Sequence, residues 1–328
     1  MAAVDLKALE TRGFVLVPSF LSEAEVRGCR DDFASRPVHT NNHNYNLSIA
    51  SGAALETVLA RVKEMLGQVS ASTNLRANLP MGALYFATER GVKFSWHQDH
   101  ESFFAIQNHY DYLNFYIPVL KPRKDRSNLC VIPFDALEKE SKRHYPGLVR
   151  GGATRFPRYG PGRMIFHDDT GRVERMRGDD LDRIAHAPEL NAGDLLLMRG
   201  DVIHRTQDAD TERVALSFRA ASTESRVSRT RLAAGSLCKA RMMANNSTVY
   251  HRLFRALDTT GAKELPFGEI LQIVARTPAP EPVPPPAFFR YLLREKARER
   301  VLLPFIGRTA STILADRAVI RDERRRGV

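Results

Sequence analysis

The chain has 328 residues, of which 43% are hydrophobic and 27% charged, with a net charge of +11; this is the composition of a globular protein long enough for one large domain or two. No apolar run approaches the length of a membrane span, and the first residues carry no basic region followed by an apolar stretch. The three scattered cysteines form neither a metal cluster nor a disulfide framework, so we expect a protein of the reducing cytoplasm without a membrane partner.

The N-terminal region is predicted to fold as a helix, a short strand and a second helix. The run GFVLVPSF, residues 13–20, is rich in β-formers and ends in Pro18 and Ser19, which indicates a strand followed by a turn. Ser22 and Glu25 have the spacing of a capping box, so we expect a helix from there to about residue 34. Residues 53–67 place apolar side chains every three or four positions, which predicts a further helix.

From about residue 81 the pattern changes to short β-type runs separated by turn signals. Many short strands at irregular spacing favour a sandwich or barrel over a parallel sheet with crossover helices. The sequence HDDTGR, residues 167–172, is typical of a hairpin turn and would place Asp169 at its tip. After residue 224 the chain is helical again, and the prolines of residues 277–286 predict an extended connector to a basic amphipathic helix.

We predict two parts: a β-rich core with N-terminal helices over residues 1–223, and a helical extension over residues 224–328 that packs on it. The extension holds 20 lysines and arginines against 10 acidic residues, and so carries most of the net charge. Such a surface attracts anionic partners or substrates, although a solvated helical surface also explains it and is the reading we favour. No aromatic-plus-basic motif of nucleic-acid-binding proteins is apparent, so nucleic acid is not the expected partner.

Three His-x-Asp pairs occur in the chain, at His97/Asp99, His109/Asp111 and His167/Asp169. Residues i and i+2 of a strand share a face, so the first pair can present an imidazole and a carboxylate together. The best candidate for a third ligand is His204, at the end of NAGDLLLMRGDVIH. Two histidines and one carboxylate on one side of a metal leave three positions open, the arrangement that suits Fe(II) and oxygen chemistry.

Nine residues after His204 begins the strictly alternating run RVALSFR. One face carries Val214, Leu216 and Phe218, and the other carries Arg213, Ala215, Ser217 and Arg219. If the polar face lines a barrel interior, its arginines need an anionic partner, because an unpaired buried charge is costly. A dicarboxylate cosubstrate would supply one, held bidentately by a planar guanidinium. This combination favours the first His-x-Asp pair as a metal site and leaves ordinary structural roles for the other two.

Six segments follow one another in a familiar order: GFVLVPSFLSEAEV, WHQD, YLNFYIPVL, SNLCVIP, AGDLLLMRGDVIH and RVALSFR. Over roughly residues 8–222 the chain thereby resembles the phytanoyl-CoA dioxygenase-like branch of the Fe(II)/2-oxoglutarate-dependent oxygenases. The resemblance implies a mainly β fold with flanking helices, whose core is a double-stranded β-helix, the jelly roll of the cupins. It also implies Fe(II) held by His97, Asp99 and His204, with 2-oxoglutarate and O2 as cosubstrates.

The same resemblance implies a set of cosubstrate residues. Arg213 would clamp the distal carboxylate of 2-oxoglutarate, and Thr206 lies where the family often has a hydroxyl near that carboxylate. Ser217 and Asn114 complete the expected cosubstrate pocket. Because the offset from His204 to Arg213 is slightly shorter than in the family pattern, Arg219 is the alternative clamp.

The implied function is oxidation, in most cases hydroxylation, of an unactivated carbon in a small-molecule metabolite, as in specialised or natural-product biosynthesis. The carboxylate of Asp99 disfavours halogenation, whereas desaturation, epoxidation and ring formation stay open. The sequence departs from the family pattern at two places, both where the family builds its substrate pocket. Pro133 leads into FDALEKE, and a long insert separates His97 from His204 by 107 positions. The arginines of residues 143–183 suggest an anionic substrate, with a solvated flap as the alternative that we slightly favour.

Two other functions stay open on the sequence alone. The same iron centre could act on a macromolecular or carrier-bound substrate, with the basic extension as its docking surface. A non-catalytic, cupin-like metal- or ligand-binding protein would need only the histidines, and would leave Arg213 without a partner.

Overall fold

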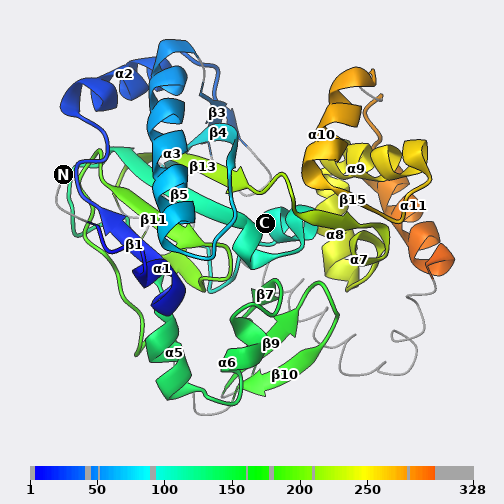
Figure 1. The fold of residues 1–328 in the computed structure, drawn as a ribbon. Helices are drawn as coiled ribbons and strands as arrows, with labels where there is room; N and C mark the ends of the chain where they lie inside the picture. Colours follow the sequence, from blue (N-terminus) through cyan, green and yellow to red (C-terminus); the bar gives the residue numbers. More distant parts are fainter. Residues whose placement is uncertain are drawn as a thin grey trace.

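The structure is a computed structural model that describes residues 4–40, 46–50, 52–88, 94–159, 162–176, 181–208, 211–278 and 281–299. At its centre lies a seven-stranded sheet, the main sheet (Figure 1). Each neighbouring pair of strands in it is antiparallel. The strand order is β1 (Phe14–Val17), β11 (Leu195–Arg199), β5 (Tyr112–Leu120), β13 (Arg213–Ala221), β4 (Leu79–Thr88), β3 (Asn46–Ile49) and β2 (His39–Thr40).

Shorter antiparallel strands form a second layer, the small sheet. In chain order they are β6 (Leu129–Val131), β7 (Thr154–Arg155), β8 (Arg158–Tyr159), β9 (Gly162–His167), β10 (Val173–Met176) and β12 (His204–Thr206). β12 pairs with β6, and β9 pairs with β7, β8 and β10. His97 connects these groups, because it forms β-bridges to both His204 and Arg155. The chain therefore passes repeatedly between the layers, from β4 to His97, on to β5 and β6, and later from β11 to β12 and β13.

Helices cover the outer face of the main sheet. α2 (Glu23–Ala34) and α3 (Gly52–Ser72) lie across it, with α1 (Ala8–Thr11) beside β1 (Figure 1). The predicted capping box is confirmed, since the Ser22 hydroxyl accepts from the Glu25 N–H and the Glu25 carboxylate accepts from the Ser22 N–H at 2.7 Å. α3 extends beyond the predicted residues 53–67, because its buried stripe continues to Val69.

The two faces of β13 belong to different cores, as its alternation predicts. Val214, Leu216 and Phe218 are buried in the core that also contains apolar side chains of α2 and α3. Ala215 belongs instead to the inner core between the two sheets, with Trp96, Tyr116, Ile132, Leu196 and Met198. Two short helices, α5 (Phe134–Glu140) and α6 (Tyr145–Leu148), contribute further side chains to this inner core. The β-rich core with flanking helices is thus present, built from mostly antiparallel sheets.

The chain after residue 224 is mainly helical and shares a third core with α4 (Glu101–Ile106), the helix that follows Asp99. Phe103, Phe104 and Ile106 of α4 are buried among apolar side chains of this region. A 3₁₀ turn (η1, His109–Asp111) leads from α4 towards β5. The later elements are β14 (Arg226–Ser228), α7 (Arg229–Ala233), α8 (Leu237–Asn245), α9 (Ser247–Thr260), β15 (Glu264–Pro266), α10 (Phe267–Arg276) and α11 (Pro285–Arg298).

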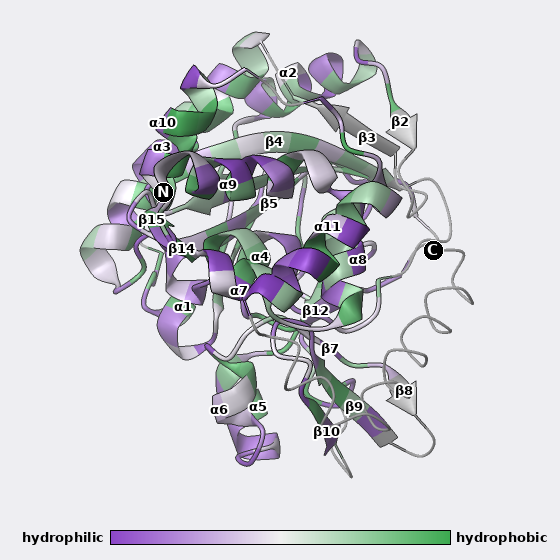
Figure 2. Cartoon of the chain, turned by 90° about the vertical axis from the view of Figure 1, so that its right-hand side faces the viewer, coloured by the Kyte–Doolittle hydropathy of each residue, from purple (hydrophilic) through white to green (hydrophobic). Residues whose placement is uncertain are grey.

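The prolines of the predicted connector divide into two groups. Pro285 and Pro286 form the first turn of α11, where proline is favoured because the missing N–H has no helical partner anyway. The extended stretch therefore ends at Pro284, and residues 279 and 280 lie outside the described ranges. Figure 2 shows purple, hydrophilic stretches along α7, α9 and α11, in line with the charge of this region. Among the described helices, none is both long and apolar enough to cross a bilayer.

Candidate metal centre

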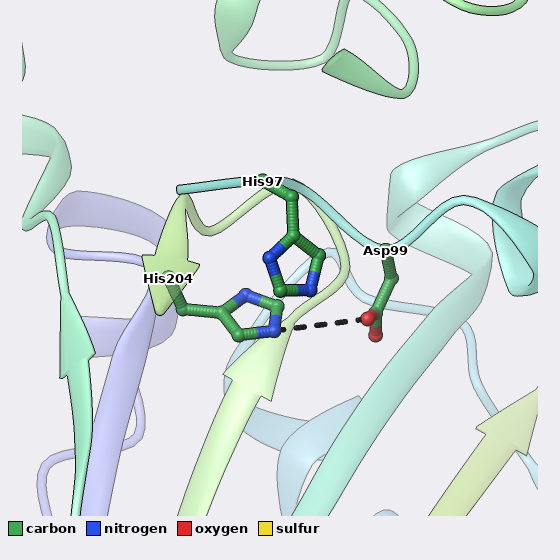
Figure 3. A group of neighbouring side chains, drawn as sticks. All are labelled: His97, Asp99 and His204. Atoms are coloured by element: carbon green, nitrogen blue, oxygen red, sulfur yellow. Dashed lines mark ion pairs between the residues drawn. The ribbon is translucent and has the colours of Figure 1, made fainter. Parts of the chain in front are cut away.

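His97, Asp99 and His204 lie together, although the two histidines are 107 positions apart in the chain (Figure 3). One ligand atom from each of the three side chains can be chosen so that all lie within 4.8 Å of one another. Nε2 of His204 is 3.8 Å from an Asp99 carboxylate oxygen. In the described part of the chain, no other group of three His, Cys, Asp or Glu side chains comes as close together.

The backbone that carries the ligands is held by a pair of reciprocal hydrogen bonds. The N–H of His97 donates to the carbonyl of His204 at 3.0 Å, and the N–H of His204 donates to the carbonyl of His97 at 2.9 Å. The predicted strand through His97 and Asp99 is reduced to this bridge and the one to Arg155, because α4 begins at Glu101. Both side chains nevertheless face His204, as Figure 3 shows.

Hydrogen bonds to backbone carbonyls orient both imidazoles. Nδ1 of His97 is 2.6 Å from the carbonyl oxygen of Ser95, and Nδ1 of His204 is 2.9 Å from that of Val202. A carbonyl oxygen only accepts, so each Nδ1 carries the proton and donates. Each Nε2 is then left with its lone pair, as metal ligation by histidine requires.

The electrostatics of the centre favour a cation. Burial, with the neighbouring His204 and His100 rings, lowers the pKa of His97 well below its ordinary value. Burial acts to raise the pKa of Asp99, but Arg219 and the nearby histidines outweigh it, so this pKa is lowered. A neutral imidazole and an ionised carboxylate at neutral pH are the forms that bind a divalent metal.

Arg213 lies on the inner face of β13 and is buried, with 4% of its surface exposed. Its Nη1 donates to the carbonyl of Ser127 at 2.7 Å, and its guanidinium lies 5.9 Å from the centre of the Tyr116 ring. Among the described residues, neither Nε of Arg213 nor the hydroxyl of Tyr116 has a partner with hydrogen-bonding geometry. Lys121 lies nearby; burial and the charge of Arg213 lower its pKa to about 8. Buried cationic and hydroxyl groups with unused hydrogen-bonding capacity fit a carboxylate ligand.

The other predicted cosubstrate residues occupy the same interior. Asn114 is buried on β5, and its Oδ1 has no partner among the described residues. Ser217 lies opposite Tyr116 in the β13–β5 register and accepts a hydrogen bond from Arg219 at 2.9 Å. Thr206 is buried on β12, where its hydroxyl accepts from the Phe94 N–H at 3.2 Å and keeps its own proton to donate.

Arg219 has different neighbours from Arg213. Its Nη2 is 3.7 Å from an Asp99 carboxylate oxygen, and its side chain is 33% exposed. The two arginines are six positions apart on one strand, which corresponds to about 20 Å between their Cα atoms. Arg219 therefore lies beside the candidate metal ligands, while the Cα of Arg213 lies towards the other end of the strand.

In the other two His-x-Asp pairs, His109, Asp111 and His167 have structural partners, in line with the structural roles that the sequence favours. Nε2 of His109 is 2.9 Å from the carbonyl of Gly152, and the carboxylate of Asp111 pairs with Arg76 at 2.7 Å. The predicted hairpin at residues 167–172 is confirmed by the pairing of β9 with β10, and His167 contacts Glu174 at 3.2 Å.

The insert is not simply a solvated flap. Residues 148, 149, 152–154 and 156 are buried, so this part of the insert, the 148–156 segment, lies within the protein. Several insert arginines already pair with carboxylates: Arg155 with Asp168, Arg163 with Asp182, Arg172 with Glu174 and Arg183 with Glu140. These four arginines are therefore structural at least in part, and do not by themselves indicate an anionic substrate.

Three features of the site were absent from the sequence-based prediction. Tyr116 lies two positions after Asn114 on the same strand, so the alternation of β5 could have indicated it. Lys121 lies just beyond the end of β5, and no sequence signal marks its proximity to Arg213. Gln98, between the two ligands, is completely buried, and only contacts between distant segments show why.

No protein-family model matches the chain, and no curated protein sequence does. Solved structures do match it. One is SnoK, a non-haem alpha-ketoglutarate-dependent carbocyclase from nogalamycin biosynthesis: identity 14%, TM-score 0.44, covering 67% of this chain and 83% of SnoK. Another is a Pseudomonas putida prolyl-4-hydroxylase: identity 13%, TM-score 0.44, covering 66% of this chain and 97% of that protein. A third is EvdO2 from Micromonospora carbonacea var. aurantiaca, complexed with 2-oxoglutarate: identity 15%, TM-score 0.43, covering 68% of this chain and 94% of EvdO2.

SnoK is thus described as alpha-ketoglutarate-dependent, and EvdO2 is described with 2-oxoglutarate bound. At identities of 13–15% and TM-scores of 0.43–0.44, the function of this chain is inferred from what its own side chains can bind and orient.

Proposed function

We propose that this protein is a non-haem Fe(II)/2-oxoglutarate-dependent dioxygenase that oxidises, and in the simplest case hydroxylates, a small-molecule metabolite. The observation that carries the proposal is the triad of His97, Asp99 and His204. Its ligand atoms lie within 4.8 Å, and both histidines have Nδ1 bound to a carbonyl. Two imidazoles and one carboxylate on one side of a metal form a ligand set that suits Fe(II). Structural zinc sites, by contrast, are typically closed and tetrahedral.

We also propose that the β-rich core is a double-stranded β-helix. The main sheet contains the order β11-β5-β13-β4, and the second layer contains β6, β12 and the bridge at His97 in that order. From β4 through the bridge at His97 to β5 and β6, and again from β11 to β12 and β13, the chain alternates between the layers, a connectivity that supports a jelly roll of two facing sheets. In such a fold the inner faces of both sheets surround the ligand site.

The cosubstrate pocket in this proposal is the interior around Arg213. A carboxylate there would satisfy Nε of Arg213 and the hydroxyl of Tyr116, and the ammonium group of Lys121 would add positive potential. Without such an anion, the buried charge of Arg213 has only the carbonyl of Ser127 as a hydrogen-bond acceptor among the described residues. The cupin-like binding protein that needs only histidines leaves this arrangement unexplained.

The chain's own residues bind, orient and exclude water. When bound, Fe(II) with 2-oxoglutarate and O2 supplies the two-electron oxidation of a C–H bond, in which 2-oxoglutarate is converted to succinate and CO2. His97 and His204 each offer an Nε2 lone pair that the carbonyls of Ser95 and Val202 hold in place. Asp99 offers a carboxylate, so it leaves no gap among the protein ligands for a halide. Trp96 and Ile203, which adjoin His97 and His204 in the chain, are buried in the inner core, so this core would shield that side of the centre from water.

We propose a free small molecule of specialised metabolism as the substrate. The long insert between β6 and β11 supports this, because its 148–156 segment is packed beside the ligands and so can shape a dedicated pocket. The alternative is a carrier-bound substrate, and a comparison of the turnover of free and carrier-bound molecules tests it. Equal turnover of the two forms would count against a carrier.

An anaerobic titration tests the proposal. Fe(II) and then 2-oxoglutarate are added to the metal-free protein and to His97→Ala, and the weak visible charge-transfer band of the Fe(II)–keto acid chelate is followed. We expect the band in the parent and its loss in the variant, because an essential ligand is gone. A parent that binds metal without developing the band would contradict the cosubstrate assignment and favour a cupin-like binding protein.

A further inference from the structure

Gln98 lies between the ligands His97 and Asp99, and its side chain enters the protein interior. Neighbouring residues of an extended chain point to opposite sides, so the amide lies on the side away from the two ligands. The residue has no exposed surface. A buried amide is costly unless its donors and acceptor are satisfied, and here they are.

The amide of Gln98 joins three segments of backbone. Its Nε2 donates to the carbonyl of Leu148 and to the carbonyl of Asp201, both at 2.7 Å. Its Oε1 accepts from the hydroxyl of Thr154 at 2.6 Å. The backbone N–H of Gln98 also donates to the carbonyl of Thr154 at 2.9 Å. Both amide donors and the acceptor are therefore used at once.

One of these partners belongs to the turn that leads to the third ligand. Asp201 is three residues before His204, and its carboxylate accepts two hydrogen bonds from the buried Arg199, at 3.0 and 2.6 Å. The same carboxylate accepts from the N–H of Arg150 at 2.9 Å. The turn is thus fixed from several sides, and Gln98 joins the His97–Asp99 segment to a rigid point.

We infer that Gln98 is a positioning residue of the metal centre. Its amide sets the separation between the segment that carries His97 and Asp99 and the turn that carries His204, and binds both to the 148–156 segment. The inference rests on the proposed metal-binding function. No other side chain offers two donors and one acceptor in this shape: glutamate lacks the donors, and methionine has no donor and only a weakly accepting sulfur.

Gln107 provides a matched control. It too is a buried glutamine, with 4% of its surface exposed, and its amide cross-links backbone. Its Nε2 donates to the carbonyl of Ser228 at 3.1 Å, and its Oε1 accepts from the Ser228 N–H at 2.9 Å. These bonds join the end of α4 to β14, so Gln107→Met removes a comparable cross-link outside the ligand-bearing segments.

The test compares Gln98→Met with Gln107→Met in the full chain, with Co(II) as the probe. Affinity is measured by titration of the metal-free protein, coordination geometry by the visible ligand-field bands of bound Co(II), and stability by thermal unfolding without metal. We expect Gln98→Met to weaken Co(II) binding by about tenfold or more, as loss of an outer partner of a metal site does, and to change the bands. We expect Gln107→Met to bind within about twofold of the parent despite a similar loss of stability.

Each result decides between a positioning role and a merely structural one. If Gln98→Met loses stability as Gln107→Met does but keeps the parent's affinity and bands, the positioning role is wrong. If Gln98→Met does not fold, Thr154→Val removes one of the same hydrogen bonds with little change of shape. A smaller weakening with altered bands then supports the inference, and unchanged binding overturns it. If the parent itself binds no Co(II), or binds it equally after His97→Ala, the proposed function has failed and the positioning role falls with it.

Discussion

Arg213 and Arg219 lie on the same face of β13 but have different surroundings. Arg213 is buried with an unused Nε, whereas Arg219 is partly exposed and lies 3.7 Å from the Asp99 carboxylate. A cation at the centre would take up the charge of Asp99 and leave Arg219 beside a positive site. This makes Arg213 the better candidate for the distal carboxylate of 2-oxoglutarate.

The two arginines can be separated by their glutamine variants. We expect Arg213→Gln to weaken 2-oxoglutarate binding by about 30-fold or more, since loss of a buried charge-assisted pair costs about 2 kcal/mol or more. Fe(II) binding should be unchanged, because Arg213 is not one of the three proposed metal ligands and makes no hydrogen bond to them. Arg219→Gln is the matched control and should alter 2-oxoglutarate binding less. The measurement is the anaerobic chelate-band titration, and a larger effect in Arg219→Gln would reverse the assignment.

Gly200 occupies a position where no side chain fits. A Cβ there would lie 1.9 Å from an atom of the Tyr112 ring. Because Gly200 directly precedes Asp201 in the turn towards His204, Gly200→Ala should displace this turn and destabilise the protein by about 3 kcal/mol. Gly67 of α3 is the control, since a Cβ there meets no atom of the described residues within 4 Å. Gly67→Ala should instead stabilise the protein by about 1 kcal/mol. Urea unfolding of both variants checks the opposite signs.

At the scale of elements, two buried lysines hold the end of α7. Nζ of Lys239 donates to the carbonyl of Arg231 at 2.6 Å, and Nζ of Lys296 donates to the carbonyls of Ala233 and Gly235. Burial and the charge of Lys296 lower the pKa of Lys239 to about 7, and burial lowers the pKa of Lys296 to about 8. The folded protein therefore holds these protons less tightly than the unfolded chain.

This difference predicts a pH dependence of stability. Between about pH 7 and the ordinary lysine pKa near 10, the unfolded chain binds more protons at Lys239 than the folded protein, so the contribution of Lys239 to stability becomes more favourable as pH rises. Lys239→Met lacks this contribution. The free energy of unfolding of the parent should therefore increase relative to that of the variant from pH 7 to pH 9, as measured by urea unfolding. A difference between the two proteins that is independent of pH would contradict the prediction.

Element-scale patterns explain why much of the centre could be predicted from sequence. The alternation of RVALSFR assigns an apolar face to the helices and a polar face to the interior, and the structure has both. His97 and Asp99 are two positions apart, so a short extended segment is enough to bring both side chains to the same side. Ser22 and Glu25 act within a single helical turn. Signals of this kind depend on residues close together in the sequence, so they can be recognised without knowledge of the fold.

What could not be predicted depends on contacts between distant segments. Nothing near Gln98 in the sequence indicates that its amide meets the carbonyls of Leu148 and Asp201. The insert looked solvated because it is rich in arginine, yet Arg155 pairs with the fully buried Asp168. The prolines before α11 looked extended throughout, although Pro285 begins the helix. In each case a partner far along the chain, or the position of a helix end, decides the outcome.

At the scale of the whole molecule, the helices after residue 224 complete a core that begins beside the proposed metal ligands. Phe103, Phe104 and Ile106 of α4 are buried against this region, and the Tyr250 hydroxyl donates to the carbonyl of Glu101 at 2.9 Å. The packing is therefore continuous from α4 to the helices that follow residue 224.

A chain that ends at residue 223 tests the predicted division into two parts. Removing the extension would expose the apolar side of α4, and each large side chain that loses its burial costs about 1.5–3 kcal/mol. We expect this shortened chain to lose cooperative thermal unfolding and to bind Co(II) much more weakly than the full chain. Circular dichroism and the Co(II) titration measure the two effects. Cooperative unfolding with unchanged Co(II) affinity would instead support an independent core of residues 1–223.

The proximity of His97 and His204, whose backbones are joined by reciprocal hydrogen bonds, has a consequence for the lifetime of the protein. A cation held by both histidines would tie together two points 107 residues apart, much as a cross-link does. Binding only to the folded state stabilises it by about 2.7 kcal/mol when free metal exceeds the dissociation constant a hundredfold. Resistance to proteolysis should then rise with metal supply, so the amount of intact protein would follow the iron available to it.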